Sequence, residues 1–126
     1  MIRKSTLGQR STVSRLIAAL EHRELTIFAH IDHAEHARQA ELSLPAIDVL
    51  IFGNPRAGTI LMAADPRVGL DLPLRMLVWE DAPQLAFVGY HDPRELAADY
   101  ELAEQKEILD RMAELLEAVS VEAAGE

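Results

Sequence analysis

The sequence predicts an α+β fold in which helices cover one face of an antiparallel or mixed sheet. Expected strands and helices follow one another as β-α-β, a short helix, β, a short helix, and then β-β-α. The last two strands, over residues 74–79 and 85–90, are close enough to pair directly, and a long amphipathic helix follows them. A hairpin followed by a closing helix is typical of a sheet with its helices packed together on one side. Apolar residues make up 49% of the chain and aromatic residues only 5%, so we expect an aliphatic core.

The N-terminal part contains the first two expected strands. A short strand over residues 2–7 precedes a helix, which Ser11 or Thr12 would cap. Apolar residues recur on one face of that helix, at Val13, Leu16, Ile17 and Leu20. The next strand covers residues 25–31, and its alternation predicts one apolar side made of Leu25, Ile27, Ala29 and Ile31.

Two short helices are expected between the strands. Asp32, with Glu35 three residues later, resembles a capping box that opens a helix ending at about Ala40. An apolar run over residues 49–52 reads as a buried strand, and Asn54-Pro55 then suits the start of a second helix. That helix would bury Ala57, Ile60, Leu61 and Ala64. The alternative is a β-hairpin with residues 53–58 as its turn, which ranks second because residues 59–64 do not alternate.

The C-terminal part supplies the expected hairpin, with residues 80–84 as its loop, and the long helix. Asp92-Pro93 with Glu95 caps the helical region. Its apolar stripe consists of Ile108, Leu109, Met112, Leu115, Leu116 and Val119, and residues 120–126 are expected to fray. Leu77, Trp79 and Phe87 would lie on the uncovered face of the sheet, which suggests dimerisation.

Length and composition limit the class of protein. The 126 residues predict a single domain over 1–126, without linkers or repeats. No segment approaches the ~20 apolar residues that cross a bilayer, and residues 1–5 do not open a signal peptide. The chain has no cysteine, so thiol catalysis and disulfides are excluded. We expect a cytoplasmic protein of bacterial type with no membrane partner.

The charge is unevenly distributed. The net charge is −9, and residues 80–126 alone carry thirteen Asp or Glu against three Lys or Arg. An acidic C-terminal third would repel phosphate backbones, so nucleic acid is not an expected partner. A solvated acidic helix face is the simplest interpretation.

Four segments, in this order, resemble a known family. They are Ile31-Asp32-His33 with Ala37, residues 50–55, residues 71–75 with residues 78–81, and Tyr90-His91-Asp92-Pro93. Through these four segments the sequence resembles the domain-of-unknown-function 302 family of small bacterial and archaeal proteins, over a core of about residues 11–119. The resemblance implies a TATA-binding-protein-like two-layer sandwich, β-α-β-β-β-β-α with short inserted helices, usually as a homodimer. It implies no established activity. Family members often have Gly where this chain has Arg23-Glu24, and Cys where it has Leu74, so thiol chemistry of relatives is absent here.

Six polar residues are shared with the family and form the candidate ligand site. If the strand ends gather them, they could bind a small anion or carboxylate, with Asn54 offering a helix N-terminus and Arg75 a bidentate clamp. The six are Asp32, His33, Asn54, Asp71, Arg75 and His91. The competing interpretation gives each a structural role, as a cap, a turn former or an ion-pair partner.

Three histidines are spaced as weak metal-ligand candidates. Imidazole nitrogens bind transition metals, and His30, His33 and His36 flank the end of one strand. The geometry argues against a full set, because His30 leaves a strand while the other two lie on a short helix. No cofactor and no catalytic residue can be assigned, since no phosphate loop, nucleophile elbow or zinc-protease motif is present.

Three functions remain open at this point. The first is a homodimeric small-molecule-binding or regulatory protein with its pocket between the sheet and the long helix. A second is a metal-assisted or acid/base enzyme using residues 30–36. The third is a purely structural or assembly module. The sequence leans away from an enzyme and does not identify the ligand.

Overall fold

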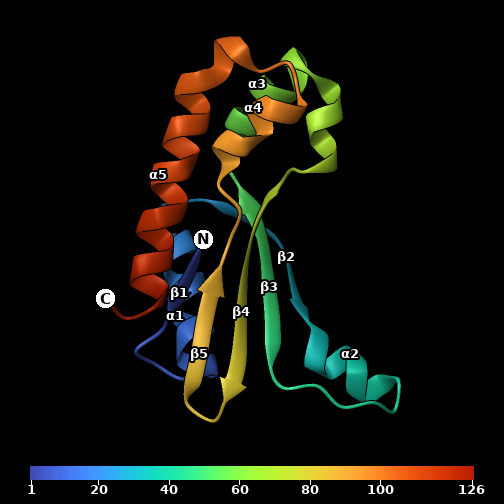
Figure 1. Cartoon of the computed structure of the whole chain (residues 1–126), viewed down its shortest axis with the longest axis vertical. Helices are drawn as coiled ribbons and strands as arrows, with labels where there is room; N and C mark the ends of the chain where they lie inside the picture. Colours follow the sequence, from blue (N-terminus) through green and yellow to red (C-terminus); the bar gives the residue numbers. More distant parts are fainter.

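The five strands form one antiparallel sheet with the order β1-β5-β4-β3-β2 (Figure 1). The computed structural model describes all 126 residues. The strands are β1 (Ile2–Lys4), β2 (Thr26–Asp32), β3 (Ile47–Gly53), β4 (Leu74–Ala82) and β5 (Leu85–Gly89). The predicted α+β sandwich with the core order β-α-β-β-β-β-α is confirmed.

The helices divide into a covering layer and short connectors. In the layer, α1 (Gln9–His22) and α5 (Lys106–Ala123) pack against each other and against the sheet. The connectors are α2 (His33–Gln39), α3 (Pro55–Ala64), α4 (Leu96–Asp99) and 3₁₀ turns at Pro66–Leu70, Pro93–Glu95 and Ala103–Gln105. Figure 1 shows α3 and α4 beyond one end of the sheet and α2 projecting near the other.

The core lies between the sheet and the α1–α5 layer. Strand β4 shows the division, since Leu74, Met76 and Val78 are buried in this core. The alternate residues Leu77 and Trp79 belong to the opposite face and are only half-buried. We call that opposite side the open face, and it is the face on which the sequence places the apolar patch.

Strand β2 does not keep the predicted alternation. Ile27 is paired with Phe52, whereas Ala29 is paired with Ile51, so Phe28 is an extra residue in a bulge. The extra residue shifts the alternation by one position, so side chains after the bulge lie on the opposite face from the one predicted. Ile27 therefore faces the helices while Ala29 and Ile31 lie on the open face, and the prediction of a single apolar side was wrong.

The local helix-start signals were mostly correct. The Asn54 side chain accepts hydrogen bonds from the backbone N–H groups of Arg56 (2.9 Å) and Ala57 (3.5 Å) at the start of α3, so the hairpin alternative is excluded. Asp32 likewise caps α2 by accepting from the N–H of Glu35 at 2.9 Å. Helix α1 is the exception, because it starts at Gln9, after Gly8, without a side-chain cap.

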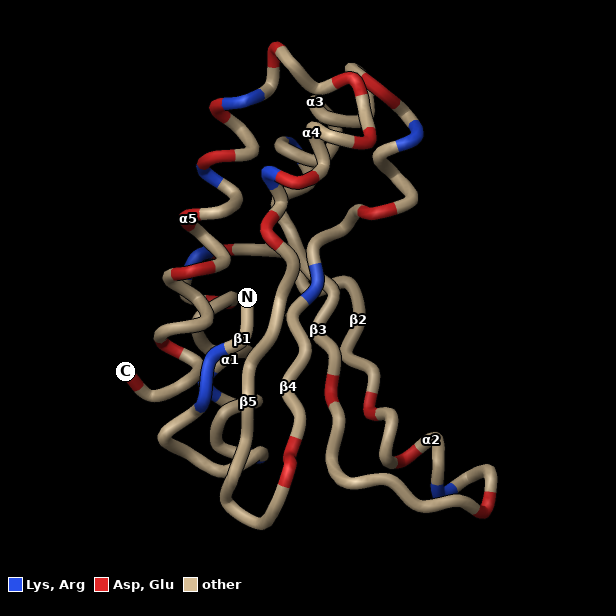
Figure 2. The backbone as a smooth tube through the Cα atoms, in the orientation of Figure 1, with Lys and Arg blue, Asp and Glu red and all other residues tan.

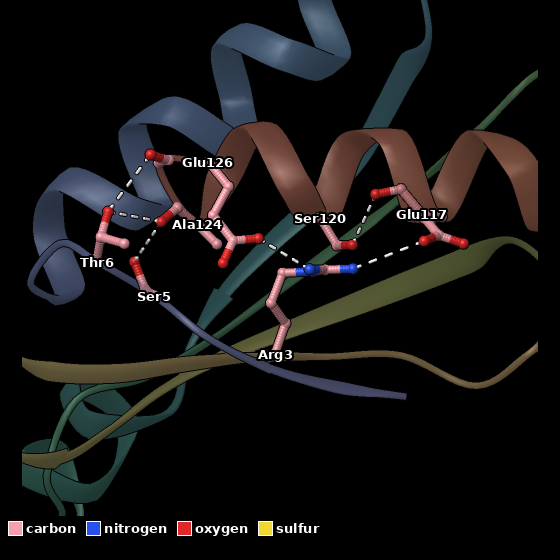
Figure 3. A network of polar contacts seen from close by, with 8 residues as sticks. Arg3, Ser5, Thr6, Glu117, Ser120, Ala124 and Glu126 are labelled. Atoms are coloured by element: carbon pink, nitrogen blue, oxygen red, sulfur yellow. Dashed lines mark hydrogen bonds and ion pairs between the residues drawn. The ribbon is translucent and has the colours of Figure 1, made fainter.

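The C-terminal residues are packed rather than frayed. Helix α5 continues to Ala123, and Ala123 and Ala124 are fully buried. Figure 3 shows why: the Thr6 hydroxyl donates to the Ala124 carbonyl at 2.9 Å, and the Arg3 guanidinium bonds the Glu126 carboxylate at 2.9 Å. Strand β1 is thereby tied to the end of α5, which closes the sandwich.

Candidate functional site

The six predicted ligand residues do not form one cleft. The Asn-Pro and Leu-Pro junctions do lie at the same end of the sheet, because Phe52 and Leu74 are paired. However, Asn54 lines a hollow on the helix side, and Asp32 lines another beside the first turn of α1. The remaining four gather around Arg75.

A hollow on the open face brings together three of the predicted residues, and we call it the open-face hollow. It has a volume of about 410 Å³. Its lining includes His33, Arg75 and His91, which come from α2, β4 and the segment after β5. Arg75 precedes Leu77 by two residues and His91 follows Gly89 by two, so the Leu77–Gly89 pairing places them across from each other. The strand register therefore brings Arg75 and His91 together, and the start of α2 adds His33.

Arg75, His33 and His91 are exposed and have no partner within the chain. None of the three side chains makes a hydrogen bond or an ion pair, although Arg and Lys side chains form eight ion pairs elsewhere. Acidic residues recur along α5 and in the segment before it (Figure 2). An unpaired guanidinium beside two imidazoles is a donor set suited to a carboxylate or another small anion.

The floor of the open-face hollow is apolar and shaped by the single tryptophan. Trp79 stacks on Phe87 with ring centroids 5.5 Å apart and 20° between the planes. Gly89 lies under the indole, because a Cβ atom placed there would be 3.0 Å from Cζ3 of Trp79. Val49 and Leu77 complete the floor. The result is an apolar surface with polar groups at its edge, which is the usual composition of a ligand pocket.

A second hollow, of about 440 Å³, shares Arg75 and His91 with the first and contains Asp71. We call it the end hollow. Two of its four acids, Asp71 and Asp92, are already engaged: the Tyr100 hydroxyl donates to Asp71, which raises the pKa of Tyr100. Arg94 bonds Asp92 and lowers the pKa of that carboxyl group. Asp71 therefore holds Tyr100, which is a structural role other than the turn former of the competing interpretation.

The histidine cluster does not converge on a metal site. No three His, Cys, Asp or Glu side chains lie close enough together to hold a metal ion. His30 belongs to the helix-facing side of β2, whereas His33 lines the open-face hollow. His36 is exposed on α2. The bulge in β2 and the turn into α2 separate the three residues.

His30 instead forms a polar cluster that sequence reasoning missed. Its Nε2 atom lies 2.8 Å from Oδ1 of Asp48, and the Gln9 amide donates to the other oxygen of Asp48 at 2.8 Å. Asp48 and Gln9 are largely buried, and the cluster borders a hollow of about 620 Å³. The available signal was Asp48 itself, since a charged residue within the apolar run of β3 needs a partner.

Comparison with known proteins gives the family. The model of the family described as "Domain of unknown function DUF302" matches residues 1–119. This chain belongs to the DUF302 family. The match begins at residue 1, ahead of the expected core of residues 11–119, since β1 is part of the sheet.

A solved DUF302 structure shows the same fold. The crystal structure of an uncharacterised conserved DUF302 protein from Bacillus stearothermophilus has a TM-score of 0.86. It is 18% identical in sequence, and the alignment covers 98% of this chain and 96% of the other. The α+β architecture is therefore a property of the family.

Curated relatives share this DUF302 segment within longer chains. Proteins named "Fluoride-specific ion channel FluC 1", from Brucella suis biovar 1 and Brucella abortus biovar 1, are each 38% identical over 91 residues. The match covers 72% of this chain but only 36% and 34% of the relatives, so the chain spans about a third of their length. No helix of this chain combines the length and hydrophobicity needed to cross a bilayer.

The groove expected between the sheet and α5 is mostly filled in this DUF302 protein. Leu109, Met112 and Leu116 are buried with at most 7% of their surface exposed. One part stays open, where α5 diverges toward α3 and leaves a hollow of about 630 Å³. We call this the α3–α5 hollow.

Proposed function

We propose that this DUF302 protein binds a small carboxylate or other small anion in the open-face hollow and acts in regulation rather than catalysis. The observation that carries the proposal is the unpaired Arg75 guanidinium, placed with His33 and His91 above an apolar floor. A carboxylate would bond Arg75 in bidentate fashion, and its apolar part would cover Leu77 and the Trp79 ring. We take the protein to be cytoplasmic.

The proposal includes a homodimer formed through the open face. Leu77, Trp79 and Phe87 are half-buried on a sheet face against which neither α1 nor α5 packs. A second copy would remove this apolar surface from water, and the hollow would then lie at the interface. The mass of the protein by light scattering tests the dimer, with Trp79→Glu expected to give the monomer and Ser14→Glu, which adds the same charge on the exposed surface of α1, as the control. A wild-type protein that is monomeric at high concentration would contradict it.

The fluoride-channel relatives support a regulatory role. In them a segment similar to this chain forms about a third of a protein whose name describes an anion channel. We propose that the DUF302 domain responds to small anions in that setting as well as here. Fluoride is accordingly one of the anions to be tested.

Binding can be measured with the protein's own fluorophore. Trp79 is the single tryptophan and lies at the floor of the hollow, so its emission should change when the hollow is occupied. We expect saturable changes with acetate, benzoate or fluoride in wild type and a loss of about tenfold or more in affinity in Arg75→Gln. Arg10→Gln, which removes an arginine from another surface, should behave as wild type. Equal responses in both variants would refute the site.

An acid/base function is the second candidate, and one observation favours it. Asp48 accepts hydrogen bonds from both His30 and Gln9, an arrangement that fixes the orientation of the His30 ring. The other ring nitrogen of His30 is then available to accept a proton. Hydrolysis of ester probes that is lost in His30→Gln but kept in His33→Gln would favour this function over the first.

A further inference from the structure

We infer that the α3–α5 hollow is a second ligand site, specific for amphipathic carboxylates that have an apolar body and one anionic end. This inference goes beyond the small-anion site of the open face, because the two hollows lie on opposite faces of the sheet and share no residue.

Apolar side chains form a large part of the lining of the α3–α5 hollow. Half of its fourteen lining residues are hydrophobic, and they come from four separate elements or their flanks. They are Leu25, Ala57, Ile60, Leu74, Ile108, Met112 and Leu115. Such a surface binds an aliphatic or aryl group by removing apolar area from water. The volume of about 630 Å³ lies within the range of pockets that hold small organic molecules.

Three arginines stand at the edge of this apolar surface, and only one of them is free. Arg23 bonds the Ala19 carbonyl and the Glu122 carboxylate, and Arg111 bonds Glu107. The side chain of Arg56 has no partner. Arg56 is therefore the group that an anionic end would meet.

The backbone N–H groups at the N-terminus of α3 are not available to bind the anionic end of a ligand. Asn54 occupies the N–H groups of Arg56 and Ala57 with its side chain and that of Gly58 with its carbonyl. Pro55 has no N–H group. The anion must then be held by the Arg56 side chain, while the aligned peptide dipoles of α3 favour the same charge.

The edge also has acidic residues, and these restrict the ligand. Arg111 neutralises Glu107, but Glu104 has no ion-pair partner. One free cation and one free carboxylate favour a ligand with a single negative charge over a dianion. A phosphate monoester would be repelled by Glu104 more than a carboxylate.

The test compares two probes that share one apolar tail. Octanoate carries the negative charge and octan-1-ol lacks it, and methyl NMR shifts of Leu25, Ile60 and Leu115 report binding in the hollow. We expect saturable shifts with both probes, with octanoate bound more tightly. Arg56→Gln should lower the affinity for octanoate by about tenfold and leave the affinity for octan-1-ol unchanged. Arg10→Gln, which removes an arginine from another surface, is the matched control. Glu104→Gln should raise the affinity for octanoate.

Further outcomes separate this site from the alternatives. Ala57→Leu fills the hollow and should abolish binding of both probes. Arg75→Gln, which weakens the open-face hollow, should leave the octanoate-induced methyl shifts of the α3–α5 hollow as in wild type, since the two hollows share no residue. Shifts that appear equally at exposed Leu42 and Leu70 would overturn the inference, as would an Arg56→Gln protein that binds octanoate as wild type does. If the methyl shifts in the α3–α5 hollow depended on protein concentration, a second copy of the chain would be the occupant. That result would also overturn the inference.

Discussion

A methyl group at Gly89 tests whether the Trp79 ring defines the floor of the open-face hollow. The Cβ atom of Gly89→Ala would lie 3.0 Å from Cζ3 of the indole, closer than ordinary van der Waals contact, and 3.4 Å from Cη2. The ring cannot move freely, since its other neighbour is the stacked ring of Phe87. The substitution therefore has to displace a packed aromatic ring.

The size of the effect follows from two opposing terms. Replacing glycine by alanine where the backbone allows it stabilises a protein by about 0.4–1 kcal/mol through the unfolded state. Overpacking costs roughly 1–3 kcal/mol when neighbours must shift. For Gly89→Ala we therefore expect a net loss of about 0.5–2 kcal/mol. Gly53→Ala supplies the reference, because a Cβ atom there meets nothing within 4 Å and the backbone φ angle is not positive.

Urea unfolding of the two variants, followed by Trp79 emission, measures both their stability and the environment of the indole in the native state. Gly53→Ala should be at least as stable as wild type and leave the emission unchanged. Gly89→Ala should be less stable, have altered native emission, and bind carboxylates in the open-face hollow more weakly. If Gly89→Ala gained as much stability as Gly53→Ala with unchanged emission, the indole would not be held where the structure places it, and the floor of the hollow would have to be redrawn.

Two further predictions concern stability away from the hollow. Asp65, buried between Arg67 and the backbone N–H of Glu101, has its pKa lowered mainly by hydrogen bonds from Arg67 and then by the bond from Glu101. Because the folded pKa lies below the ordinary value of about 3.9, this contribution is complete above that pH and declines as the pH falls through the folded pKa. Asp65→Asn should therefore be less stable than wild type near neutral pH, and the difference measured by urea unfolding should shrink on acidification below pH ~4. Leu116→Ala, at 1% exposure on α5, should cost about 2–5 kcal/mol, whereas Leu70→Ala, at 82% exposure, should stay within about 0.5 kcal/mol of wild type in the same assay.

Local signals were the part of the fold that the sequence predicted best. Asn54-Pro55 and Asp32 were recognised as helix starts because a capping side chain bonds an N–H group only two or three residues away. The extra residue at Phe28 could not be recognised, because a bulge is defined by the partner strand and not by the strand itself. The packed C-terminus was missed for a similar reason, since Thr6 and Arg3 hold it from more than a hundred residues away.

The candidate site was predicted as residue types and not as an arrangement. His33, Arg75 and His91 come together because of the antiparallel register of β4 and β5 and the place where α2 begins. Asp32 and Asn54 belong to the same family motifs, but both are used as caps and lie elsewhere. The resemblance to a family supplied the set of residues, while the sheet decides which of them meet.

Two of the acidic residues near Arg75 are bonded to other side chains, which reduces the competition for its guanidinium. Arg75 is part of the wall between the open-face hollow and the end hollow, and the end hollow contains Asp71 and Asp92. In a chain with a net charge of −9, a guanidinium in that position would be expected to pair with one of them. Tyr100 donates to Asp71 and Arg94 bonds Asp92, so these two acids are engaged elsewhere. Glu95 and Asp99 line the same hollow and make no ion pair, with Arg75 or with any other residue. The contacts of Asp71 and Asp92 therefore remove two of the four acids that would compete with a bound anion for Arg75.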